Sequence, residues 1–209
     1  MDWIALLEYA PDLADWAVTV AMGLGIAATC GLRAFLPMLA VSLLAMTGRV
    51  ELHESFAFMG TWPATFLFLV ATVAEIAGDK FPGVDHFMDA YGLVLKPMAA
   101  TVSAAAFIAH VDPLTAVALG LIGGGASASL LGIAKAKVRA LSSVSTLGLG
   151  NPVLSLGEDV VAIAAIALTV IAPLLALGCL ILVAGCVVAW AGSRWAHRRA
   201  IHSLQLETD

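Results

Sequence analysis

The segment EIAGDKFPGVDHFMDAYG, residues 75–92, places four carboxylates, a lysine and a histidine in the middle of a strongly apolar chain. The 209 residues are 61% hydrophobic and 12% charged, and their mean hydropathy of +1.00 is above that of a soluble domain of this length. Several apolar runs approach the roughly 20 residues that a helix needs to cross a bilayer. Because an open sheet would leave backbone groups unpaired in lipid, these runs are expected to be helices. The sequence therefore predicts an all-α, polytopic membrane protein.

Six transmembrane helices are expected within a single membrane domain, residues 1–209. The first apolar segment is too long for one straight crossing, and Pro37 removes a backbone donor inside it, so a kink or break is expected there. The last apolar run is also too long for one crossing, since a helix rises only about 1.5 Å per residue, and it is divided near Pro173. The expected spans are residues 15–47, 62–79, 90–110, 114–141 and the two parts of 152–191.

Small residues recur at four-residue spacing in two of these spans, and such ridges let helices approach closely, within one chain or in a homodimer. The ridges are Gly23, Ala27 and Gly31, and then Gly120, Gly124, Ala128 and Gly132. The two three-helix halves, residues 15–110 and 114–192, each open with such a ridge on a long, interrupted helix. Three spans in each half also give the halves opposite orientations, which is typical of an inverted repeat.

Basic residues indicate the orientation in the bilayer. With six spans and both termini in the cytoplasm, most lysines and arginines, including those of the cytoplasmic tail at residues 193–209, fall on the inner side. Only Arg49 is clearly outside. The N-terminal segment MDWIALLEYAPDLAD lacks the basic region and cleavage site of a signal peptide and predicts an interfacial helix. The expected location is the bacterial inner membrane.

Two carboxylate pairs form the candidate ion- or proton-binding site. Glu75 and Asp79 are four residues apart and share a helix face. Glu75 lies roughly 20 Å into the second span, in the inner part of the bilayer, and Glu158 and Asp159 reach a similar depth from the other half. Carboxylates inside a membrane are costly and usually face a bundle interior or a water-filled cavity. Converging carboxylates could bind a hard cation or share protons.

Basic and neutral side chains complete this candidate site. Arg33 is expected either to snorkel or pair with backbone carbonyls, or to face a carboxylate such as Glu75 or Glu158. Lys96 is expected to be a counter-ion to Asp89 or Glu75, or to snorkel to the inner surface. Asn151 and Ser155 would add neutral ligands. A further group belongs either to the site or to a solvated, mutually paired loop at the interface: Asp79, Lys80, Asp85, His86 and Asp89.

Transport of a small solute or cation, with or without proton coupling, is the function that these features favour. The alternative is a structural or assembly protein whose polar residues lock its helices together. A third reading is a Mg²⁺-dependent intramembrane transferase, since Asp85 and Asp89 have the DxxxD spacing. The sequence has no HExxH, P-loop or nucleophile-elbow motif and no basic-aromatic surface for nucleic acid, so neither an enzyme nor a nucleic-acid partner is expected. No cofactor is expected beyond a bound cation, whose identity stays open.

Four stretches together resemble one bacterial membrane family, the domain of unknown function 4126. They are GLRAFLPMLA at 31–40, EIAGDKFPGVDHFMDAYG at 75–92, GGGASA at 123–128 and NPVLSLGEDVVA at 151–162. The resemblance covers about residues 20 to 175. It implies a small polytopic membrane protein without an assigned activity.

Residues 75–80, EIAGDK, are also similar to the Glu-x-Gly-Asp-Lys-Ser/Thr signature of calcium/manganese–proton antiporters related to the lysine exporters. In that family the signature occurs in both inverted halves and its acids bind the cation, which would make Glu75 and Asp79 ligands here. This chain departs from the signature in three ways. One extra residue precedes Gly78, Phe81 replaces the hydroxyl residue, and the second half offers only GEDV at 157–160.

Overall fold

The computed structural model describes residues 3–81, 84–108, 113–146 and 150–206. Of residues 3–13, 85–87, 89 and 191–206 it describes the backbone alone. Every regular element over these ranges is helical, as expected. In chain order the elements are α1 (Trp3–Thr29), α2 (Phe35–Met46), the 3₁₀ helix η1 (Glu54–Gly60), α3 (Trp62–Gly78), α4 (Val84–Phe107), α5 (Pro113–Gly120), the π-helical turn η2 (Leu121–Gly125), α6 (Ala126–Thr146), α7 (Asn151–Ile171) and α8 (Pro173–Leu206).

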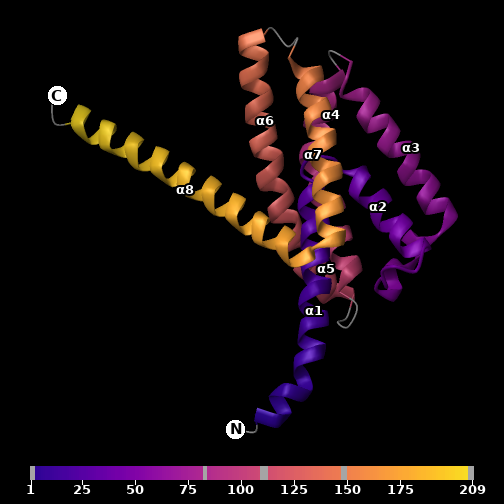
Figure 1. The fold of residues 1–209 in the computed structure, drawn as a ribbon. Helices are drawn as coiled ribbons and strands as arrows, with labels where there is room; N and C mark the ends of the chain where they lie inside the picture. The colour runs from indigo at the N-terminus through magenta and orange to yellow at the C-terminus, as the bar shows by residue number, and fades with distance from the viewer. Residues whose placement is uncertain (1–2, 82–83, 109–112, 147–149, 207–209) are drawn as a thin grey trace. The chain divides into compact units, whose positions relative to one another are not determined.

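The first apolar segment is broken, as Pro37 predicts. Helix α1 ends at Thr29, a turn follows, and α2 starts at Phe35 and runs toward α3 (Figure 1). Pro37 lies in the first turn of α2, where the N–H that it lacks would have had no partner inside the helix. The last apolar run is also divided as predicted, since α7 ends at Ile171 and α8 begins at Pro173.

Four described helices are long and apolar enough to cross a membrane. They are Ala90–Phe107, Pro113–Thr146, Asn151–Ile171 and Pro173–Trp190. A fifth candidate is the pair Glu54–Gly60 and Trp62–Gly78, which is bent by 67°. The break in the first segment leaves only two shorter apolar helices, Ala14–Thr29 and Phe35–Met46, so length and composition do not confirm the predicted six spans. The inverted repeat is not confirmed either, because the run Pro113–Thr146 continues through η2 where the first segment breaks.

The two ridges of small residues pack against other helices of the same chain. A Cβ atom added to Gly31 would overlap the Ala128 carbonyl oxygen, and one added to Gly124 would lie 2.7 Å from the Ala100 carbonyl oxygen. Helices α1, α4 and the run from α5 to α6 therefore meet almost backbone to backbone. Since the ridges are used inside the chain, they give no support to the predicted homodimer.

Gly124→Ala is expected to destabilise the fold by about 1–3 kcal/mol, because the added methyl overlaps a backbone oxygen and the Cβ atoms of Ala27 and Ala104. Gly157→Ala is the matched control: it lies in α7, where an added Cβ meets nothing within 4 Å. That variant should be neutral or gain up to about 1 kcal/mol from helix propensity. Thermal unfolding of the two detergent-purified variants measures the difference, and equal melting temperatures would contradict the close packing.

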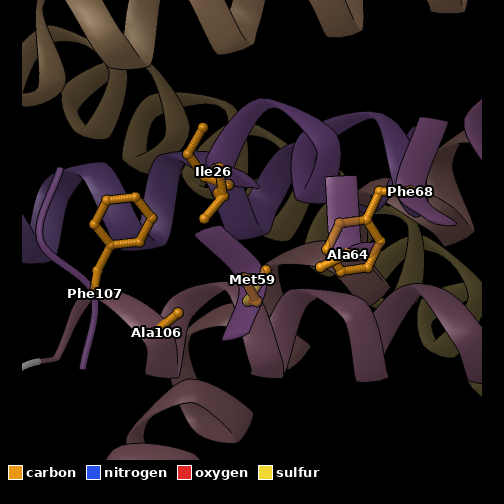
Figure 2. Close-up of a cluster of buried hydrophobic side chains, with 7 residues drawn as sticks. Ile26, Met59, Ala64, Phe68, Ala106 and Phe107 are labelled. Atoms are coloured by element: carbon orange, nitrogen blue, oxygen red, sulfur yellow. The ribbon is translucent and has the colours of Figure 1, made fainter. Parts of the chain in front are cut away.

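A buried apolar cluster holds the broken segment against α3 and the end of α4. Its members are Ile26, Val41, Met59, Ala64, Phe68, Ala106 and Phe107, and Figure 2 labels six of them. Beside it, the Ser42 hydroxyl donates to the Met59 carbonyl at 2.5 Å and hydrogen-bonds the Thr65 hydroxyl at 2.6 Å. These contacts fix α2 between η1 and α3, with its N-terminus facing the C-terminal end of α3.

The chain divides into two compact units, Met1–Leu177 and Gly178–Asp209. The first unit contains α1 to α7 and every interaction of the candidate site. The second continues α8, whose backbone remains helical to Leu206. The predicted tail at residues 193–209 therefore starts as part of this helix.

Candidate functional site

A charged cluster lies where the C-terminal end of α3, the C-terminal half of α6 and the N-terminal half of α7 come to the same end of the first unit (Figure 1). The name charged cluster is used below for eight side chains: Arg33, Glu75, Asp79, Lys80, Lys135, Arg139, Glu158 and Asp159. It brings together all four carboxylates that the sequence singles out. They come from α3 and α7, and basic side chains from two other segments lie among them.

Arg33 is the fully buried centre of the charged cluster. Its guanidinium forms an ion pair with Asp79, and its Nη2 lies 2.7 Å from Asp159 Oδ1. The same nitrogen donates to the Ser155 hydroxyl at 2.8 Å. Arg33 thus faces carboxylates, which is one of the two arrangements expected from the sequence, the other being snorkelling or pairing with backbone carbonyls. The named partners, Glu75 and Glu158, are wrong: in each pair the other carboxylate, Asp79 or Asp159, pairs with Arg33.

Two basic residues of α6 complete the cluster, and sequence reasoning counted them only as cytoplasmic charges. Lys135 Nζ lies 2.9 Å from Glu158 Oε2, and Arg139 Nη2 lies 3.0 Å from Glu158 and 3.1 Å from Asp79. Both side chains are only 3% exposed. Their four-residue spacing puts them on one helix face, and that spacing is the signal that could have identified them. Lys135 also donates to the Leu32 carbonyl at 3.3 Å.

Glu75 accepts hydrogen bonds from the backbone at the start of α2. Its Oε1 accepts the Ala34 N–H at 2.8 Å, and its Oε2 accepts the Phe35 N–H at 3.1 Å. These are orphan donors at the start of α2, where Ala34 provides no side-chain cap. A carboxylate at a helix N-terminus is favoured by the helix dipole. Glu75 therefore caps α2 from a different helix, a role that the sequence did not predict.

A cavity of about 140 Å³ adjoins this contact. Its charged lining comes from Glu75, Asp79, Lys96 and Lys135, and the rest of its wall from Ala34, Phe35, Met88, Tyr91, Gly92 and Leu95. Lys96 is buried, so it does not snorkel to a surface. It lies beside the same cavity as Glu75, which is one of its two predicted counter-ions.

The model of one protein family, described as Domain of unknown function (DUF4126), matches residues 20–193. The chain belongs to the DUF4126 family. The match confirms the resemblance noted from the sequence and continues past its expected end into α8. Neither a curated protein nor a solved structure matches the chain, so the similarity to the antiporters is not shown.

The other residues that the sequence predicted for the site of this DUF4126 protein do not lie together. Asn151 begins α7 and donates to the Ser143 hydroxyl at 3.0 Å, away from Arg33, whereas Ser155 lies inside the cluster. The side chains of Asp85, His86 and Asp89 lie outside the described residues, although their backbone is part of α4. Among the side chains that the structure describes, no three His, Cys, Asp or Glu residues are grouped to hold a metal. In the charged cluster, the carboxylates pair with lysine and arginine side chains rather than grouping around a metal position.

Lys80→Ala is expected to lower stability by less than about 1 kcal/mol. Lys80 Nζ lies 3.3 Å from Asp159 Oδ2, but its side chain is 34% exposed, and partly exposed ion pairs contribute little. Thermal unfolding in detergent, with Lys80→Arg alongside, tests this. A loss as large as that expected below for Arg33 would show that the pair is as important as the buried ones.

Proposed function

We propose that this DUF4126 protein transports a small solute across the membrane, that the cavity beside Glu75 is the solute site, and that Glu75 carries a proton linked to transport. The observation that carries the proposal is the double role of Glu75. Its carboxylate lines the cavity and at the same time holds the N-terminus of α2, the second part of a broken helix. Discontinuous membrane helices that present a helix end to a cavity are the usual construction of transporter sites.

Glu75 differs from the other carboxylates in its partners. Asp79, Glu158 and Asp159 each form an ion pair with at least one lysine or arginine. Glu75 instead accepts two backbone N–H groups. A proton on Glu75 would remove the charge that favours its place at the helix dipole and would leave one weaker acceptor. The protonation state of Glu75 and the position of α2 would then depend on each other.

The neighbouring helices offer a place for motion. Helix α4 contains Pro97, and η2 is a π-helical turn in the run that packs against it. Pro97 has no N–H to donate to the Leu93 carbonyl, which interrupts the hydrogen bonds of α4, and Thr101 Oγ1 donates to the Pro97 carbonyl at 2.8 Å. Helix kinks at proline and π-turns are frequent at functional positions in helices. We propose that α4 and the run from α5 to α6 flex here during transport.

The same proposal includes six membrane spans arranged as an inverted repeat. α1 and α2 together make the sixth crossing as one broken span, and the halves at 15–110 and 114–192 have opposite orientations. Both termini then lie in the cytoplasm of a bacterial cell, with the protein in the inner membrane and the charged cluster in the inner half of the bilayer. The clustering of basic residues in the inner loops and C-terminal tail supports this orientation. No enzymatic activity is proposed.

A structural role is the second candidate, and the ion pairs of Arg33 favour it. Buried charge pairs that join the turn before α2 to α3 and α7, and α6 to α3, could serve only to fix these helices. A structural protein would move no solute. A measured flux therefore separates the two functions.

Reconstitution into liposomes that contain a pH-sensitive dye tests transport. Three probes are added from outside in separate experiments: ethanesulfonate, tetramethylammonium and glycerol. None of them moves protons across a plain bilayer, so protein-free liposomes give the baseline. With one probe of the three, proteoliposomes should change their internal pH faster than this baseline. An internal pH that stays at the baseline with all three would overturn the proposal and favour the structural role.

A further inference from the structure

One buried hydroxyl of α3 has no hydrogen-bond partner in the part of the chain that the structure describes. The residue is Thr72, which is 4% exposed and whose Oγ1 is unpaired there. Thr101 and Thr169, by contrast, each donate to the carbonyl four residues earlier at 2.8 Å. A buried hydroxyl without a partner destabilises a fold, so its presence calls for an explanation.

Thr72 lies one turn before Glu75 on α3, and both side chains are buried. Residues three apart on a helix have Cβ atoms about 5–6 Å from each other. Side chains of a helix lean toward its N-terminus, so Glu75 extends over the turn that carries Thr72. Rotation of the Glu75 side chain can therefore bring its carboxyl group to the Thr72 hydroxyl while α3 stays in place.

The charged and the protonated forms of Glu75 need different partners. The carboxylate accepts the N–H groups of Ala34 and Phe35 and has no hydrogen to donate. The protonated form carries an O–H donor, for which these two N–H groups offer no acceptor. Thr72 Oγ1 offers an acceptor one turn away. The hydroxyl is thus unpaired beside the charged form and suited to the protonated one.

We infer that Thr72 is the hydrogen-bond partner of Glu75 when Glu75 is protonated. This inference rests on the proposed function, in which Glu75 carries the proton linked to transport. On proton uptake, the carboxyl group turns from α2 toward Thr72, and its O–H donates to Thr72 Oγ1. The proton stays on Glu75, and Thr72 keeps its own hydrogen. Thr72 is therefore a positioning residue that holds Glu75 away from α2 while the proton is bound.

Other charged or titratable groups near Glu75 also act on its protonation. Helix α2 carries none, and η1, with Glu54, precedes the end of α3 that is remote from Glu75. On α4, the side chains of Asp85, His86 and Asp89 lie outside the described residues. The described groups nearest to Glu75 are Cys30, Arg33, Asp79, Tyr91, Lys96 and Lys135. Since the wild type and a Thr72 variant share all of these groups, a difference between the two proteins isolates the hydroxyl.

Amide hydrogen exchange at Ala34 and Phe35 of the detergent-purified protein, corrected for the intrinsic pH dependence of exchange, reports the pH at which Glu75 leaves α2. Thr72→Val keeps the branched shape and removes the acceptor. Because the protonated form loses a hydrogen bond, protection should fall at a pH about 0.5–1 unit lower than in the wild type. Thr72→Ser keeps the hydroxyl and should match the wild type.

Thr65→Val is the matched control, because Thr65 lies two turns before Thr72 on α3 and its hydroxyl is already paired with Ser42 at 2.6 Å. This variant should melt below the wild type and lose protection at the wild-type pH. Thr72→Val should melt no lower than the wild type at neutral pH, because it removes an unpaired hydroxyl.

The outcomes separate this inference from the function on which it rests. If Thr72→Val loses protection at the wild-type pH or above it, or if Thr72→Ser behaves like Thr72→Val, the role of Thr72 is overturned while the proton on Glu75 stands. A melting temperature of Thr72→Val well below that of the wild type would also overturn it, since the hydroxyl would then be paired beside the charged form. Protection that is independent of pH in the wild type would overturn both. The liposome experiment decides transport independently: the expected shift without any flux would support the pair of Thr72 and Glu75 in a protein that does not transport.

Discussion

Arg33→Met is expected to lower the free energy of unfolding by about 3–5 kcal/mol, because removing one partner of a buried ion pair leaves the other charge without compensation. Asp79 would keep Arg139 and Lys135, but among the described side chains Asp159 would keep only the partly exposed Lys80. In thermal unfolding, the loss corresponds to a melting temperature about 6–20 °C below that of the wild type.

The double variant Arg33→Met/Asp159→Asn distinguishes the loss of this pair from a packing effect of methionine. Neutralising Asp159 removes the stranded charge, so the double variant should be more stable than Arg33→Met. The single variant Asp159→Asn completes the double-mutant cycle. If the two losses simply add, Arg33 and Asp159 are not coupled, and the close contact between them does not stabilise the fold.

Glu75→Gln is expected to lower proton-driven solute uptake about 5–150-fold, the range that a coupling free energy of about 1–3 kcal/mol produces. Glutamine has nearly the same shape and can still accept one of the two N–H groups of α2, but it cannot carry a proton at physiological pH. Uptake is measured in proteoliposomes under an imposed pH gradient. The solute is the probe that changed the internal pH in the liposome experiment described above.

Gly185→Ala is the control for this flux experiment. An added Cβ at Gly185 in α8 meets nothing within 4 Å, and the residue lies far along the chain from Glu75. Its uptake should equal that of the wild type. Uptake by Glu75→Gln at the wild-type rate, with the same dependence on the pH gradient, would assign the proton to another group.

The sequence predicts the fold best where one residue type forces a local outcome. Pro37 and Pro173 mark real helix starts because a proline in the first turn lacks an N–H that would have no partner inside the helix, whereas Pro97 lies inside α4. The small-residue ridges predict close helix contacts. The number of spans is harder to predict. Summed hydropathy over residues 15–47 indicates enough apolar length for a crossing, but α1 and α2 are separate shorter helices.

The candidate site was predicted in its acids and in Arg33, but the two basic residues of α6 were missed. Carboxylates in an apolar sequence attract attention because their burial is costly, so Glu75, Asp79, Glu158 and Asp159 could be selected from the sequence alone. Lys135 and Arg139 could not be assigned in this way, because lysine and arginine near a span end also fit the inner surface. Their role depends on the contact of α6 with α7, which only the folded chain shows.

Amide hydrogen exchange at the first turn of α2, followed as the pH is lowered, tests the link between Glu75 and α2 most directly. Wild type and Glu75→Gln are compared over the pH range in which both stay folded, with rates corrected for the intrinsic pH dependence of exchange. If Glu75 holds α2 only while it is charged, protection of the Ala34 and Phe35 amides falls at low pH in the wild type. In Glu75→Gln, protection should be lower and independent of pH. Equal protection at every pH in the wild type would contradict a proton on Glu75 that controls α2.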